Sequence, residues 1–151
     1  MNHKICSKNY FTPLFLLYLV CVIPVIVIYY MHGTHELEES DKLKALGNET
    51  KAIKTQAEGT FLLVAAWIYV IATIIIGVFP KNPIAYLIVI VLTLVAIIVW
   101  LGRSEFGIPI PGTDLTITKF VVGPEGFWTK SLQAILLVPI SILLARYKSI
   151  S

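Results

Sequence analysis

Two histidines and a glutamate, His32, His35 and Glu36, are the residues of this chain whose types and spacing best suit a metal ion. If the apolar segment before them continues as a helix, residues three apart share one face, which brings these side chains together. Zinc and copper accept imidazole and carboxylate ligands. Further ligands could come from the acids that follow, Glu38, Glu39 and Asp41. Because Gly33 weakens a helix at this point, ordinary solvated polar residues at a helix end remain the alternative.

Other patterns associated with catalysis are missing from the sequence. The two cysteines, Cys6 and Cys21, do not form a C-x-x-C pair, and they are too differently placed to suggest a disulfide. There is no glycine-rich phosphate loop, no metalloprotease helix and no nucleophile elbow. The sequence therefore predicts no catalytic activity of its own. It requires no cofactor, and copper or zinc at the histidines is the open alternative.

The elements that would position these residues are four uncharged apolar stretches: Asn9–Met31, Gly59–Pro80, Asn82–Gly102 and Ser131–Ala145. About 20 apolar residues suffice for a helix to cross the hydrocarbon core, and the first three stretches reach that length. The fourth becomes long enough if its helix begins at Pro124, with Lys130 extending to the outer interface. Hydrophobic residues make up 57% of the chain and charged residues only 14%, against about a quarter charged in soluble domains.

These stretches predict an all-α membrane protein with one domain, a four-helix antiparallel bundle spanning residues 1–151. The expected helices cover about 9–31, 59–80, 82–103 and 124–147, and the expected outer loops cover 32–58 and 104–123. Aromatic residues near the ends of the stretches, among them Tyr29 and Tyr30, are predicted to lie at the interface with the lipid headgroups. The lipid bilayer is therefore the first expected partner.

The distribution of charge predicts the orientation of the bundle. All nine acids fall within residues 32–58 and 103–126, whereas the two tails and the link between the second and third stretches carry only basic residues. Short basic segments stay on the cytoplasmic side, so both termini are predicted to be cytoplasmic, in the cell membrane or an inner membrane. This placement accounts for the net charge of +3 without a nucleic-acid partner.

The first expected outer loop, residues 32–58, combines charged residues with a thin apolar stripe at helical spacing. Gly47 and Asn48 interrupt the stripe, so the sequence predicts one or two short surface helices over the bundle. The triplet that begins at Asn48 is a glycosylation sequon on the predicted outer side. Asn48 is therefore a candidate glycosylation site, although such triplets also occur by chance.

The second expected outer loop is rich in turn formers, and its residues 115–122 alternate with a period near two. This pattern predicts a short strand or an extended lid. Stiff apolar loops at a membrane surface pack on the bundle or against another subunit. We therefore expect a partner to dock at Pro109, Pro111, Phe120 and Trp128.

The interior of the predicted spans contains few polar residues: Thr73, Thr93, Gln133 and Ser141. Such residues typically form hydrogen bonds between membrane helices. With Lys130 assigned to the interface, no ionisable side chain is expected at depth, which argues against a proton relay, a transporter of charged substrates and a bis-histidine haem site.

Two functions are compatible with these patterns. The first is a non-catalytic accessory subunit of a larger integral membrane complex, such as a respiratory oxidase or a membrane monooxygenase, with other integral membrane subunits as partners. The second is a small independent membrane protein that binds copper, zinc or a redox partner at its outer surface through His32 and His35. A four-helix plan serves many unrelated functions, so fold alone does not choose between them.

Overall fold

The computed structural model describes residues 10–102, 108–117 and 124–149. In this part of the chain the long helices are α1 (Phe11–Ala45), α2 (Glu49–Val78), α3 (Pro83–Gly102) and α4 (Pro124–Arg146). A short 3-10 helix, η1 (Tyr147–Ser149), follows α4. Between α3 and α4, the two-residue strands β1 (Ile108–Pro109) and β2 (Thr116–Ile117) pair in antiparallel register.

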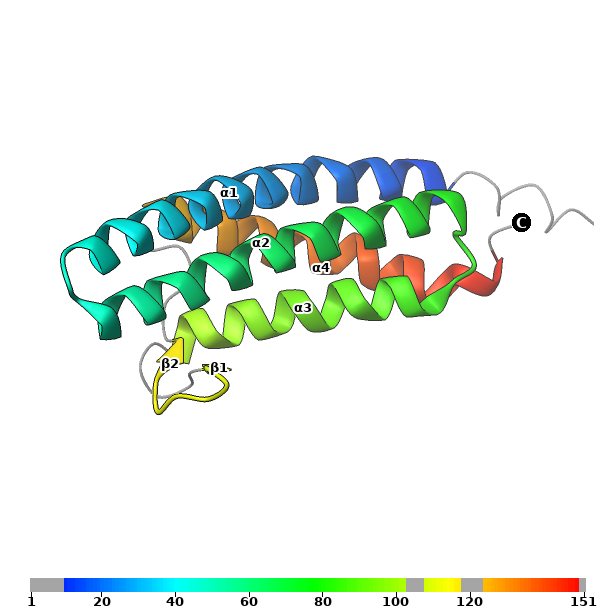
Figure 1. The fold of residues 1–151 in the computed structure, drawn as a ribbon. Coiled ribbons are helices and arrows are strands. Elements are labelled where there is room, and N and C mark those ends of the chain that lie inside the picture. The colour runs from blue at the N-terminus through cyan, green and yellow to red at the C-terminus, as the bar shows by residue number, and fades with distance from the viewer. Residues whose placement is uncertain (1–9, 103–107, 118–123, 150–151) are drawn as a thin grey trace, which may run out of the picture.

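Each of the four helices is long and apolar enough to cross a membrane, so the described part of the chain is that of an integral membrane protein in contact with lipid. Around the bundle, α1 contacts α2, α2 contacts α3, α3 contacts α4, and α4 contacts α1. Successive helices run in opposite directions (Figure 1). The start of α1, the turn between α2 and α3 and the end of α4 lie together at one end, with the α1–α2 turn and the β1–β2 pair at the other (Figure 1).

The structure differs from the loop that was expected over residues 32–58. Both flanking helices continue through this segment, and only residues 46–48 separate α1 from α2. Gly47 has a positive φ of 75°, its N–H donates to the Lys44 carbonyl, and the Asn48 N–H donates to the Leu43 carbonyl. These bonds form a Schellman motif, which terminates a helix where glycine can adopt the left-handed conformation. The interruption expected at Gly47 and Asn48 is confirmed, but it separates two long helices.

A close crossing of α1 and α2 supports this extension. Gly33 and Gly59 are both buried, and a Cβ atom added to Gly59 would lie only 2.8 Å from the Gly33 carbonyl oxygen. Farther toward the turn, the Ser40 hydroxyl donates a 2.8 Å hydrogen bond to the Ala52 carbonyl. Small residues let membrane helices approach closely. Gly33 therefore does not end α1, and its missing side chain is what admits α2.

The starts of α3 and α4 both lie at prolines. The Asn82 side-chain oxygen accepts a 3.0 Å hydrogen bond from the Ile84 N–H, and Pro83 is the first residue of α3. Proline is favoured at this position because the N–H that it lacks has no partner within the helix. The fourth helix begins at Pro124, as the sequence predicted.

Candidate functional site

Five buried polar side chains meet inside the bundle, and we call them the polar layer: Tyr29, Tyr69, Thr93, Lys130 and Gln133. Tyr29 comes from α1, Tyr69 from α2 and Thr93 from α3, while α4 supplies the other two. Four of the side chains are 0% exposed, and Lys130 is 5% exposed. All four helices therefore contribute to one cluster.

Lys130 and Gln133 form the centre of the polar layer. Lys130 Nζ lies within hydrogen-bond distance of Tyr29 Oη, at 2.9 Å, and of Gln133 Oε1, at 3.0 Å. Gln133 Nε2 donates to Tyr29 Oη at 2.8 Å and to Tyr69 Oη at 3.2 Å. The two tyrosine rings meet edge to face with their centroids 6.3 Å apart. The amide of Gln133 thus joins α4 to both α1 and α2.

The far side of the polar layer fixes the direction of these hydrogen bonds. The Thr93 hydroxyl donates its single hydrogen to the Val89 carbonyl at 2.7 Å. Thr93 must then accept from the Tyr69 hydroxyl, which lies 2.8 Å away. Because Tyr69 uses its hydrogen on Thr93, its oxygen accepts from Gln133. The amide nitrogen of Gln133 therefore faces the tyrosines, and its oxygen faces Lys130.

This arrangement overturns the expectation that Lys130 extends to the outer interface, because its side chain turns into the bundle instead. The predicted interhelical role of Gln133 and Thr93 is confirmed. Thr73 behaves similarly, since its hydroxyl lies 2.7 Å from Tyr18 Oη and so joins α2 to α1.

Tyr29 is fully buried within the bundle, whereas its neighbour Tyr30 is 52% exposed. The spacing of Lys130 and Gln133, three residues apart on one helix, was the available signal that both side chains share a face.

The predicted metal ligands lie on α1, in the part that extends beyond the first apolar stretch. His35 is exposed, whereas His32 and Glu36 are half-buried. Among the described residues, no group of three or more His, Cys, Asp or Glu side chains is arranged to hold a metal ion. Binding of copper or zinc here stays a prediction.

The other predicted site residues lie at separate places. Asn48 is exposed at the turn between α1 and α2. Pro109 and Pro111 are exposed beside α2, whereas Phe120 lies outside the described residues. Trp128 is 65% exposed on α4, and its ring meets that of Phe127 edge to face. Glycosylation and docking at these residues stay predictions.

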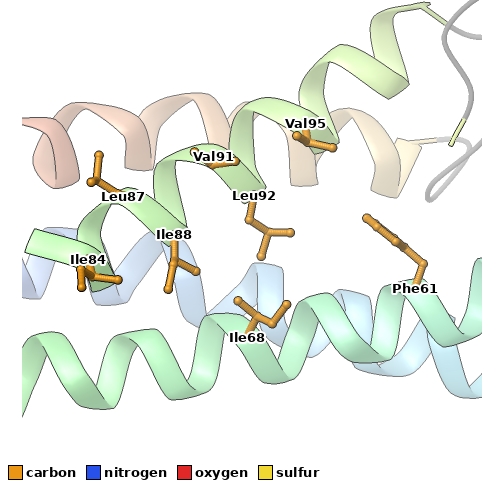
Figure 2. Close-up of a pocket in the computed structure, with 8 residues that line it drawn as sticks. All are labelled: Phe61, Ile68, Ile84, Leu87, Ile88, Val91, Leu92 and Val95. Carbon is orange, nitrogen blue, oxygen red and sulfur yellow. The ribbon is translucent and has the colours of Figure 1, made fainter.

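A groove of about 400 Å³ lies between α2 and α3. Figure 2 shows Phe61 and Ile68 of α2 facing the side chains of α3 across this groove, with α3 diverging from α2 along its length. We call it the α2–α3 groove. Its lining is entirely apolar: Phe61, Ile68, Ile84, Leu87, Ile88, Val91, Leu92 and Val95.

A second hollow, of about 450 Å³, lies between the N-terminal half of α2 and the segment around β1, and we call it the hairpin hollow. Phe61 lines both spaces, so they adjoin along α2. Most of the lining is apolar, with Gln56 and Thr60 as its polar members. The residues are Ile53, Gln56, Ala57, Thr60, Phe61, Val64, Pro109, Ile110 and Pro111.

Comparison with known proteins adds no assignment to these features. The chain matches no protein-family model, and no curated protein or solved structure is significantly similar to it. The polar layer joins the four helices through hydrogen bonds, whereas the linings of the groove and the hollow suit apolar side chains or lipid.

Proposed function

We propose that this chain is a non-catalytic structural subunit of a larger integral membrane complex. The observation that carries the proposal is the hairpin hollow. Ile53 and Ala57 precede Gly59, where the second apolar stretch begins, so this end of the hollow extends beyond the segment that lipid tails cover. Exposed apolar surfaces of this kind mark sites of protein contact.

The continuity of the two spaces supports a partner that is itself a membrane protein. Phe61 joins the hairpin hollow to the α2–α3 groove, which lies between two helices able to cross the membrane. A partner with a membrane helix and an exterior segment would fill both spaces along one continuous strip of α2. The exposed prolines Pro109 and Pro111 border this strip and limit the entropy lost when the segment docks.

The state of the polar layer supports a structural role. Among the described residues, every buried side-chain nitrogen or oxygen has a hydrogen-bond partner. The polar layer thus uses its groups to join the four helices and fixes the surface that a partner would recognise. A network whose members are all satisfied favours one packing arrangement over others.

Filling the hairpin hollow is expected to release the partner. Val64 lines the hollow and is 51% exposed, so Val64→Trp would occupy the space without disturbing the core. Val20→Trp is the matched control, because Val20 is 68% exposed on α1. After purification in mild detergent, wild type and Val20→Trp should retain the same companion chain at fixed stoichiometry, and Val64→Trp should lose it. A wild-type protein that purifies as a folded single chain, or retention by Val64→Trp, would contradict the proposal.

We also propose that both termini are cytoplasmic, on the strength of the charge distribution. In a variant without native cysteines, new cysteines at Asn48 and Thr113 should react with an impermeant thiol reagent applied to sealed cells. A cysteine at Lys81, in the α2–α3 turn, should react only after permeabilisation. All three positions are exposed, as labelling requires. Ser40, in the extended part of α1, is buried, so it is unsuitable as a labelling position. The reverse labelling pattern would show that the orientation is inverted.

A further inference from the structure

If Lys130 is an ammonium and Tyr29 a phenol, the hydroxyl hydrogen of Tyr29 has no acceptor within the polar layer. An ammonium donates to Tyr29 Oη and to Gln133 Oε1, which lie at 2.9 and 3.0 Å. Tyr29 Oη then accepts from both Lys130 and Gln133 Nε2. The hydrogen of the Tyr29 phenol would find no acceptor among these contacts.

Reversing the Gln133 amide does not remove this conflict. Its oxygen could then accept from Tyr29, but its nitrogen would face the ammonium, and two donors would oppose each other. The chain of bonds from Val89 through Thr93 and Tyr69 also holds the amide in its observed orientation. The surplus hydrogen therefore belongs to the pair Lys130 and Tyr29.

Removing one proton from this pair resolves the conflict. The Tyr29 phenol can then donate to the free electron pair of the Lys130 amine, while the amine donates to Gln133 Oε1. Moving the shared proton to nitrogen gives an ammonium beside a phenolate, with the same number of protons and no net charge. Both forms avoid an uncompensated charge inside a membrane bundle, which would be costly.

We propose that Lys130 and Tyr29 form a proton-binding site that holds one shared proton and links α4 to α1. Uptake of a second proton gives an ammonium and a neutral phenol. The hydroxyl hydrogen of Tyr29 then has no acceptor within the polar layer. The α1–α4 contact then weakens. The bundle is therefore more stable when the site is singly protonated at higher pH, and it loses that stability as the pH falls. This inference does not depend on the proposed partner.

The groups that face this pair come from each neighbouring helix. Tyr69 of α2 and Gln133 of α4 face it through the hydrogen bonds already described, and α3 contributes Thr93 behind Tyr69. The Lys130 ammonium would also lie 5.2 Å from the centroid of the Tyr29 ring. Among these residues, Lys130, Tyr29 and Tyr69 can titrate, and Tyr69 already gives its hydrogen to Thr93.

Thermal unfolding in lipid nanodiscs at several pH values tests the proposal. From about pH 9 to about pH 5, the wild-type unfolding midpoint should fall by about 2–8 °C more than that of Lys130→Met. The methionine variant keeps His32, His35 and the acids, so the difference between the two curves isolates the Lys130 site. Lys130→Arg, whose guanidinium cannot give up its proton, should be less stable than wild type across the same range. Parallel curves for wild type and Lys130→Met would overturn the proposal.

A spectroscopic measurement keeps the test decisive if a variant fails to fold. In the wild-type protein labelled with ¹⁵N at lysine Nζ, the exposed Lys81 should give an ammonium signal throughout this range. The Lys130 signal, assigned by its loss in Lys130→Arg, should be shifted from that position at neutral pH and should move toward it on acidification. Tyr29→Phe removes the phenol that shares the proton, so it should change the pH dependence of the Lys130 signal. An ammonium signal from Lys130 at every pH, with no phenolate absorption, would also overturn the proposal.

Discussion

Gly59→Ala is expected to lower the free energy of unfolding by about 1–3 kcal/mol, although alanine is the better helix former. The added Cβ would lie 2.8 Å from the Gly33 carbonyl oxygen and 3.0 Å from Glu36 Cβ. Backbone atoms of α1 cannot move aside as a flexible side chain can, so the two helices must separate. Every contact along this crossing would then weaken, including the hydrogen bond from Ser40 to the Ala52 carbonyl.

Gly77→Ala on the same helix is the matched control for this prediction. A Cβ at Gly77 would approach only the Phe15 ring, at 3.3 Å, and that ring can shift. We expect this variant to be neutral or slightly stabilised, because the gain in helix propensity is about 0.5–1 kcal/mol. Unfolding in mixed detergent micelles, followed by circular dichroism, gives both values. Equal effects of the two substitutions would show that the Gly33–Gly59 approach does not limit stability.

Gln133→Leu is expected to cost about 1–3 kcal/mol of unfolding free energy, because it leaves buried polar partners without hydrogen bonds. A single hydrogen bond between membrane helices contributes only about 0.6 kcal/mol on average. Gln133, however, bonds to Lys130, Tyr29 and Tyr69 together. Its loss therefore affects the contacts of α4 with both α1 and α2.

The same replacement at Gln56 serves as the control for Gln133→Leu. Gln56 is exposed on α2, so Gln56→Leu should change the unfolding free energy by less than about 0.5 kcal/mol. Both variants should insert into the membrane, because neither adds charge to a span. Unfolding in the same mixed micelles would compare them directly. A cost for Gln133→Leu no larger than that of a single typical hydrogen bond would mean that the polar layer contributes little to the stability of the bundle.

Much of the secondary structure could be predicted because it depends on local properties of the chain. The capacity of a segment to cross a membrane follows from its length and apolar composition, and all four predicted spans correspond to helices in the described residues. The starts at Pro83 and Pro124 follow from local capping chemistry. The interruption at Gly47 follows from the ease with which glycine adopts a positive φ.

The candidate site was predicted only in its parts. Gln133 and Thr93 were expected to join helices, but their partners were not identifiable. Lys130 was assigned to the interface because a lysine near the start of a span can usually reach water. That assignment failed because Tyr29 and Gln133 lie within hydrogen-bond distance of Lys130 Nζ inside the bundle. Tyr69 in turn accepts a hydrogen bond from Gln133.

By itself, the sequence of this protein determined the four membrane helices, the interruption at Gly47 and the starts of α3 and α4, since these depend on composition and on neighbouring residues. Only the tertiary structure decided which way each helix turns its faces. The extension of α1 and α2 past the apolar stretches depends on contacts between residues such as Gly33 and Gly59, which lie 26 positions apart. The burial of Lys130 depends on Tyr29, more than 100 positions away, because a side chain turns inward only where another helix supplies its partner.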